Sequence, residues 1–213
     1  MRLFAAVHPT RAAREHLIGA LREVRELTGT ALRWGDPEQW HVTLAFYGEQ
    51  PEAAVPELGE LLSDVARDHA PLTVCLRGAG SFSGTTLWMG VGGASDALVE
   101  LMHACSLDPE ERARQRAHLT VARMSRAERT RKARERRRSS RTVARPGPEL
   151  AHVVHALSVY EGPAWTVSEL SLVSSELGEG RSGGALHRTV QRFRLSERVA
   201  SDAPGRMPEE GCR

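Results

Sequence analysis

The sequence predicts an α+β fold, because amphipathic helical segments and short strands follow one another without the regular alternation of a doubly wound sheet. Residues 2–7 form a short apolar run that predicts a buried first strand. Residues 41–48 alternate between apolar and polar side chains, as expected for a strand with one buried face. Between them, Thr10 can cap a helix. The buried face of that helix is expected to carry Leu17, Leu21 and Val24.

The remaining elements follow in the same irregular order. They are a helix carrying Leu58, Leu61, Leu62 and Val65, strands over 71–77 and 86–91, a helix over 95–107, a strand over 117–123, a helix near 149–157, and strands over 167–175 and 188–195. The two similar segments around His41 and His118 lie 77 residues apart, far beyond the period of solenoid repeats. Two lobes built to a similar plan fit this spacing better.

The composition is that of a folded globular protein. The chain has 213 residues, 40% of them hydrophobic, and a formal net charge of +2, which allows one sizeable domain or two small lobes sharing a core. Lys132 is the only lysine; arginine binds phosphate with a planar fork, although a GC-rich genome produces the same bias. Three separated cysteines argue against a disulfide framework or a zinc site. No apolar run is long enough to span a membrane, and we expect a cytoplasmic monomer.

Two segments differ from the rest of the chain. Residues 123–146 hold eleven basic side chains, opposed only by Glu128 and Glu135. Because this segment has too few apolar residues for a core face, we expect a solvated loop or a frayed basic helix inserted in the domain. We expect a single domain over 1–196 and a disordered tail over 197–213.

Two short motifs carry the candidate chemistry. They read His41-Val42-Thr43-Leu44 and His118-Leu119-Thr120-Val121. Successive side chains of a strand point to opposite faces, so each motif offers an imidazole and a hydroxyl on one face and buries two aliphatic side chains on the other. One such motif arises by chance in alternating strands, whereas two in matching contexts indicate a shared cleft.

Such a cleft suits phosphodiester hydrolysis without a metal or another cofactor. One neutral imidazole can take a proton from water, and a second, protonated imidazole can give one to the leaving oxygen. Threonine hydroxyls can donate hydrogen bonds to phosphate oxygens as charge develops on them.

The paired motifs resemble those of the 2H phosphoesterases, and their surroundings resemble the RNA 2′,3′-cyclic phosphodiesterases, also described as 2′–5′ RNA ligase-like proteins. The resemblance covers nearly all of residues 1–196. Its further residues are Met1–Val7, Arg33-Trp34, Trp40, Ala45–Glu49, Phe82, Leu87–Val91, Ala117, Ala122-Arg123 and Leu170–Leu177.

The resemblance implies a bilobal fold, with two pseudo-symmetric antiparallel sheets and outer helices around a central cleft. It also implies opening of an RNA 2′,3′-cyclic phosphate to a 2′-phosphate, on an RNA 3′ end such as that of a tRNA or on a nucleoside 2′,3′-cyclic phosphate. His41 would then donate a proton to the departing 3′ oxygen, and His118 would activate water. Thr43 and Thr120 would hold the phosphate oxygens.

The chain departs from the usual pattern of this family at three places. The basic run after the second motif is longer and richer in arginine. Ala117 precedes His118 where proline is usual, and Gly184-Ala185-Leu186-His187 replaces a glycine followed by tyrosine. The sequence does not determine whether His187 lines the cleft.

Further substrate-binding candidates each have a simpler structural explanation. Arg123 has the opposite strand parity to His118, so a phosphate contact there requires a bulge or the end of the strand. Trp34, Trp40 and Trp88 can stack on a base or simply pack in the core. His152 and His155 lack the spacing of metal ligands.

Two other functions fit the same residues. The basic run can serve an RNA-binding protein of this fold without turnover, contacting phosphates in a salt-dependent way, or it can lack a partner altogether. Reversible 2′–5′ RNA ligation would use the same site, since one site catalyses a reaction in both directions.

Overall fold

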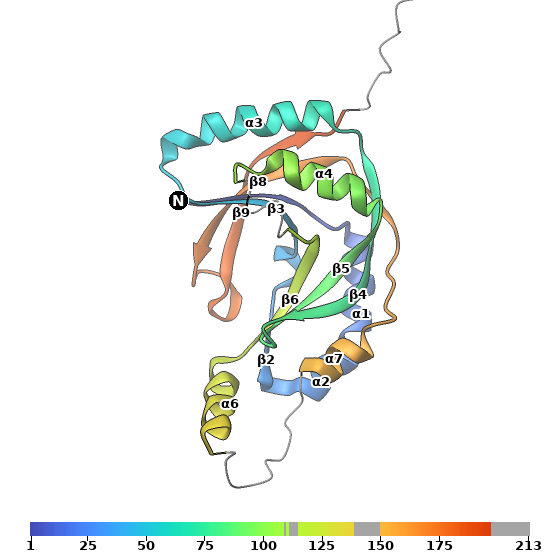
Figure 1. Cartoon of the computed structure of the whole chain (residues 1–213), viewed down its shortest axis with the longest axis vertical. Helices are drawn as coiled ribbons and strands as arrows, with labels where there is room; N and C mark the ends of the chain where they lie inside the picture. The colour runs from blue at the N-terminus through green and yellow to red at the C-terminus, as the bar shows by residue number, and fades with distance from the viewer. Residues whose placement is uncertain (109, 111–114, 139–149, 197–213) are drawn as a thin grey trace, which may run out of the picture.

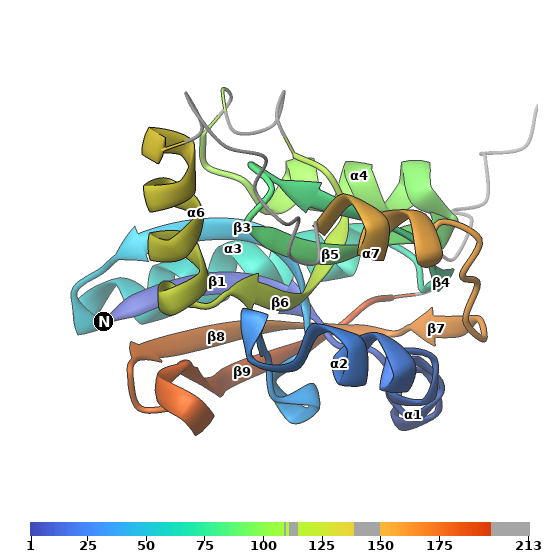
Figure 2. The same ribbon diagram turned by 90° about the horizontal axis from the view of Figure 1, so that it is seen from below.

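The computed structural model describes residues 1–108, 110, 115–138 and 150–196. Within them it forms one curled, antiparallel nine-stranded sheet flanked by helices (Figures 1 and 2). The expected tail, residues 197–213, and residues 139–146 of the basic run lie outside the described part. In that part, no helix is long and apolar enough to cross a membrane.

Strands and helices alternate irregularly along the chain, as the sequence predicted. The strands are β1 Arg2–Val7, β2 Leu32–Trp34, β3 Val42–Glu49, β4 Leu72–Phe82, β5 Thr86–Gly93, β6 His118–Met124, β7 Trp165–Val167, β8 Glu169–Leu177 and β9 Ala185–Arg194. The α-helices are α1 Arg11–Ala20, α2 Arg22–Thr28, α3 Val55–Asp68, α4 Ser95–Cys105, α6 Arg126–Arg138 and α7 Leu150–Ala156, and short 3-10 helices cover Gly29–Ala31, Pro37–Gln39, Glu52–Ala54 and Arg181–Gly183.

The strand order divides the sheet into two lobes that meet at its centre. The order is β7-β4-β5-β6-β3-β1-β8-β9, with β2 pairing to β6 off this path. The two motif strands, β3 and β6, are antiparallel neighbours at the junction. The predicted α+β, two-lobed architecture is therefore confirmed, but the lobes are not the two halves of the sequence. Strand β2 pairs with β6 of the second lobe before β3 is formed in the first lobe, and the chain returns to the first lobe with β8 and β9.

Several local predictions hold with small changes. Thr10 caps α1, its hydroxyl accepting from the Ala13 N–H, and Leu17, Leu21 and Val24 are buried. Their helix is broken at Leu21 into α1 and α2. The strand predicted over 167–175 is in fact two, β7 and β8, and the short strand β2 was not predicted because three residues are too few to show a period.

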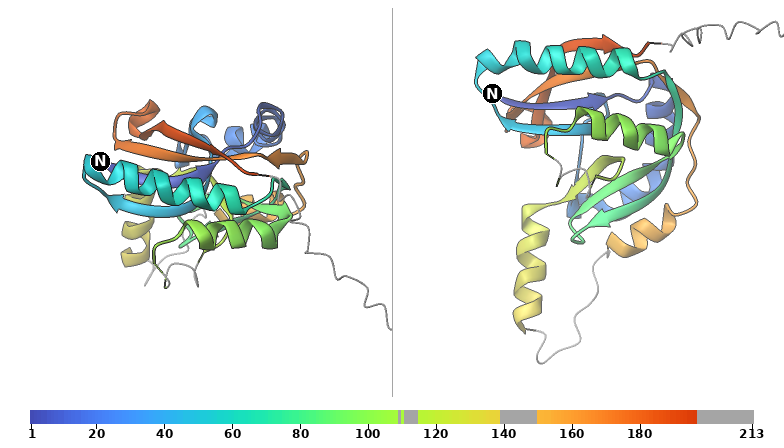
Figure 3. Two further views of the ribbon diagram at one scale, coloured as in Figure 1. Left: turned by 90° about the horizontal axis from the view of Figure 1, so that it is seen from above. Right: turned by 45° about the horizontal axis from the view of Figure 1, so that its top comes forward.

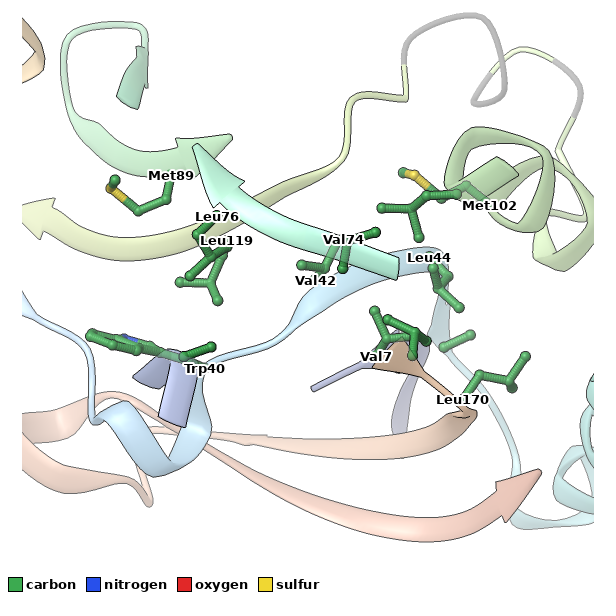
Figure 4. Close-up of a cluster of buried hydrophobic side chains, with 14 of the residues drawn as sticks. Val7, Trp40, Val42, Leu44, Val74, Leu76, Met89, Met102, Leu119 and Leu170 are labelled. Atoms are coloured by element: carbon green, nitrogen blue, oxygen red, sulfur yellow. The ribbon is translucent and has the colours of Figure 1, made fainter. Parts of the chain in front are cut away.

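The aliphatic residues of the two motifs build the core beneath the central strands. Val42, Leu44, Leu119 and Val121 are at most 1% exposed. Figure 4 shows Val42 and Leu119 among buried side chains of β4 and β5, with Trp40 beside them. Figure 3 shows α3 and α4 running across one side of the molecule, and α4 packs against β3. The alternation predicted from the sequence therefore holds within both four-residue motifs. It breaks after Leu44 and after Val121, where the next residue is also buried and the strand shifts register against a neighbour.

The described part of the basic run is a helix. Strand β6 continues to Met124, so Arg123 belongs to the sheet. The Ser125 hydroxyl accepts from the Glu128 N–H at 3.2 Å, and α6 follows over Arg126–Arg138. Of the two predicted alternatives, loop or basic helix, these residues adopt the helix.

Candidate active site

A cavity of about 520 Å³ lies between the two lobes and is lined by both motifs. His41, Thr43, His118 and Thr120 all contribute to its surface. Each of the four side chains is partly exposed, while the aliphatic residues between them are buried. The structure thus brings together the four residues that strand parity had assigned to one face.

The register between β3 and β6 sets the spacing of the two motifs. Val42 is the partner of Leu119 across the strand pair. One residue further on each side, His41 lies across from Thr120 and Thr43 across from His118. The two histidines are therefore diagonal neighbours, a relation that separates side-chain origins by about 7–8 Å. This span lets two imidazoles approach one phosphate from opposite sides.

Each of the two histidines is held by a hydrogen bond to the backbone carbonyl two residues before it. Nδ1 of His41 donates to the Gln39 carbonyl at 2.8 Å, and Nδ1 of His118 donates to the Arg116 carbonyl at 2.7 Å. A carbonyl can only accept, so the proton of each neutral ring is on Nδ1. Nε2 is left as the nitrogen that can take up or deliver a proton in the cavity.

His41 lies in an aromatic environment that disfavours its charge. Its ring is 4.8 Å from Phe4 and 4.9 Å from His187, centroid to centroid. The pKa of His41 is lowered to about 4, chiefly by burial and also by His187, His8 and Arg123, while the hydrogen bond to Gln39 opposes the shift. His41 is thus largely neutral near pH 7.

His118 lies on the opposite wall, beside the aromatic side chains of Phe82 and Trp88. The Phe82 ring is 4.9 Å away and nearly perpendicular to the imidazole, and the Trp88 ring is 6.1 Å away. Phe82 is 39% exposed. A flat apolar surface therefore borders the second histidine at the edge of the cavity.

A bulge in β6 brings Arg123 to the cavity. Thr120 pairs with Trp88 and Ala122 with Leu87, so Val121 is an extra residue in the strand. The extra residue reverses the side-chain parity after it, and Arg123 lines the cavity with His118 and Thr120. On strand parity alone, Arg123 can contact a phosphate only if a bulge or the strand end turns it towards the cleft. The bulge at Val121 does this.

Positive charge predominates around the cavity. Its lining includes Arg2, Arg33, Arg123 and Arg181, with Asp36 as its carboxylate. Burial lowers the pKa of Arg123, and the neighbouring Arg33 lowers it further. The site is electrostatically suited to an anion that relieves this repulsion.

The other candidates from the sequence occupy different positions. His187 lines the cavity, and burial lowers its pKa, with Arg123 and His8 acting in the same direction. Trp34 also lines it, with the Arg25 guanidinium 5.2 Å from its ring centroid. Trp88 packs on Phe82 and His118 outside the cavity lining, and Trp40 is only 3% exposed.

The other two histidines that the sequence singled out, His152 and His155, are exposed on α7. They lie outside the cavity lining. Among the described residues, no three His, Cys, Asp or Glu side chains gather as a metal site would require.

Sequence reasoning missed the residues that tie distant segments of the site together. The Gln39 side chain accepts the His187 backbone N–H at 2.6 Å, while its own carbonyl holds His41. Arg33 donates to the Gly183 carbonyl at 2.9 Å, which ties the loop before β9 to β2. These contacts join segments about 150 residues apart in the sequence, so no local pattern could indicate them.

Comparison with known proteins points to phosphoesterases, as the paired motifs did in the sequence. Residues 7–88 match the family described as LigT like Phosphoesterase. The chain is 29% identical to a Thermus thermophilus protein named RNA 2′,3′-cyclic phosphodiesterase, over 98% of this chain and 99% of that protein. A Methanothermobacter thermautotrophicus protein of the same name is 25% identical over 92% and 99% of the two chains.

Solved structures share the fold over nearly the whole chain. A crystal structure of a Thermus thermophilus protein superposes with a TM-score of 0.60 at 25% identity, covering 92% of this chain and 98% of that one. E. coli LigT in apo form gives a TM-score of 0.63 at 21% identity with the same coverage. These findings agree with the resemblance seen in the sequence: over nearly its whole length the chain is similar to proteins named RNA 2′,3′-cyclic phosphodiesterase, and it shares its fold with E. coli LigT.

Proposed function

We propose that this protein is an RNA 2′,3′-cyclic phosphodiesterase that opens the cyclic phosphate to a 2′-phosphate without a metal ion. The observation that carries the proposal is the pairing of Val42 with Leu119, which aligns two His-x-Thr motifs on one face of the sheet. Relatives matched over nearly their full length bear the name of this activity.

In the proposed reaction, His118 takes a proton from water and the resulting hydroxide attacks phosphorus. The bond between phosphorus and the 3′ oxygen breaks, and protonated His41 gives its proton to that oxygen. The products are a 2′-phosphate and a 3′-hydroxyl. Proton exchange with solvent then restores both imidazoles. Each proton transfer contributes about 10²- to 10⁴-fold to the rate.

The threonines and Arg123 stabilise the phosphate through this step. Thr43 and Thr120 flank the two imidazoles and are positioned to donate hydrogen bonds to non-bridging oxygens. Arg123 supplies a full positive charge on the same face of β6. As the oxygens gain negative charge in the transition state, these donors stabilise it more than they stabilise the substrate.

Because the pKa of His41 is low, we expect the bound substrate itself to favour protonation of this histidine. An acid must be protonated before it can donate, whereas burial leaves free His41 largely neutral. A bound phosphodiester places a negative charge beside the ring and favours its protonated form. Proton uptake by His41 would thus accompany substrate binding.

Hydrolysis of a nucleoside 2′,3′-cyclic phosphate in EDTA tests the proposal. We expect turnover by the wild type, a loss of about 10²- to 10⁴-fold in kcat for His41→Ala or His118→Ala, and none for His152→Ala or His155→Ala on the surface of α7. Absence of turnover in the wild type, or unchanged kcat in the two active-site variants, would contradict it. Product analysis with tRNA halves separates hydrolysis from 2′–5′ ligation.

A further inference from the structure

Helix α6 is the strongly charged element that the proposed reaction does not use. Its thirteen residues carry eight basic side chains and two acidic ones, a formal charge of +6, in a chain whose total is +2. The rest of the chain is therefore net negative. Attraction for a polyanion is concentrated in this one helix together with the arginines of the cavity.

The helix has no apolar face with which to pack against the body. Ala127 and Ala133 are its only apolar residues. Figures 1 and 3 show α6 standing away from the sheet. An isolated helix of this length is marginal in water, and a helix that is polar all round needs charged partners to persist. Its sequence is explained by an external partner better than by the fold.

Three arginines of α6, Arg126, Arg129 and Arg134, are available to such a partner. Arg131 makes a bidentate contact with Glu128, at 2.8 Å and 2.5 Å, which fixes one turn of the helix. Arg126, Arg129 and Arg134 are exposed, and in the described part of the chain no carboxylate pairs with them. Free guanidinium groups on an ordered helix suit the oxygens of successive phosphates.

The position of α6 links it to the cavity. Strand β6 carries His118, Thr120 and Arg123, and only Met124 and Ser125 separate Arg123 from the first residue of α6. Arg33 of β2 is the cross-strand partner of Arg123. The arginines of the cavity and those of the helix are therefore close in the chain, and the helix adds about 20 Å of length beyond the cavity.

We propose that α6 is a docking arm for the RNA strand that leads into the cavity, contacting its phosphates without reading its sequence. This makes the preferred substrate a polynucleotide with a cyclic phosphate end, not a mononucleotide. A membrane surface is disfavoured, because helices that lie on membranes need an apolar face. The inference rests on the proposed function in one respect: that function identifies the group that enters the cavity as the terminal cyclic phosphate.

The test compares two substrates with one variant. The substrates are a nucleoside 2′,3′-cyclic phosphate and a twelve-nucleotide RNA ending in the same group, and the variant is Arg126→Gln/Arg129→Gln/Arg134→Gln. Glutamine keeps the helix propensity of arginine. The matched control, Arg22→Gln/Arg67→Gln/Arg194→Gln, removes the same charge from α2, α3 and β9.

We expect kcat/KM for the RNA to fall roughly 10- to 100-fold at about 0.1 M salt in the α6 variant, with the slope of log kcat/KM against log salt concentration reduced by about 2. The mononucleotide should be hydrolysed as by the wild type, which also reports that the variant is folded. The control variant should keep most of its preference for the RNA.

Other results would overturn the inference. They are equal losses on both substrates, no loss on the RNA, or an equal loss in the control variant. Binding of the α6 variant to the RNA and to phosphatidylserine vesicles is measured in parallel; lost vesicle binding with intact RNA binding would assign α6 to a membrane. If the wild type turned over neither substrate, the proposed function would fail, while RNA binding would still decide the role of α6.

Discussion

His41 should gain a proton when an anion enters the cavity, and sulfate tests this directly. Burial lowers its pKa from 6.5 to about 4, so roughly one free molecule in a thousand is protonated there at neutral pH. Sulfate keeps its charge between pH 4 and pH 7, so a change in its affinity with pH reports a change in the protonation of the protein. A sulfate beside Nε2 favours the imidazolium.

The size of the effect follows from linkage. If sulfate restores the ordinary pKa of 6.5 to His41, protonated enzyme binds sulfate about 300-fold more tightly than neutral enzyme. Since the bound state holds a proton that the free state lacks, the Kd for sulfate should fall as the pH falls. The decrease is about tenfold per pH unit between the two pKa values.

Calorimetric titration of sulfate at several pH values measures this slope, and NMR of the His41 Cε1–H signal measures the pKa with and without sulfate. His8 and His187 face the same ring and also have lowered pKa values, so His8→Phe and His187→Phe determine their shares. His41→Ala should flatten the slope. A free His41 that titrates at 6.5 or above, or one unaffected by saturating sulfate, would refute the reasoning.

Three further outcomes are expected. Arg123→Gln should lower kcat/KM for a cyclic phosphate about 10- to 100-fold by removing a charge-assisted hydrogen bond, and full activity in steady-state kinetics would exclude a phosphate contact. Leu119→Ala should lower the free energy of unfolding by about 2–5 kcal/mol in urea titrations, because its side chain is fully buried; a loss under 1 kcal/mol would contradict this packing. As the pH falls from 6.5 towards 4, the free energy of unfolding should decrease by about 3 kcal/mol because of His41. The unfolded chain binds a proton at this histidine in that range, whereas the folded protein, in which its pKa is about 4, does not. In His41→Ala the free energy of unfolding should lose that much less over the same pH range, so Tm should fall less steeply with pH than in the wild type. Identical Tm curves for the two proteins would count against a buried neutral His41.

Much of the site follows from local sequence. Strand alternation assigns His41 and Thr43 to one face and Val42 to the other, since a strand repeats every two residues. The same argument holds for the second motif, and the buried aliphatic residues confirm it. The basic character of residues 123–146 is likewise visible without a structure, although the choice between loop and helix was not.

Other features depend on contacts between distant residues. The pairing of Val42 with Leu119, the bulge at Val121 that turns Arg123 into the cavity, and the approach of Phe4 and His187 to His41 arise only when the sheet closes. The burial that lowers the pKa of His41 has the same origin. The sequence by itself determined which side chains each strand presents, because that depends on backbone geometry along one segment. Only the tertiary structure decided which strands are neighbours and how much water reaches them, because strand register and burial depend on residues far apart in the chain.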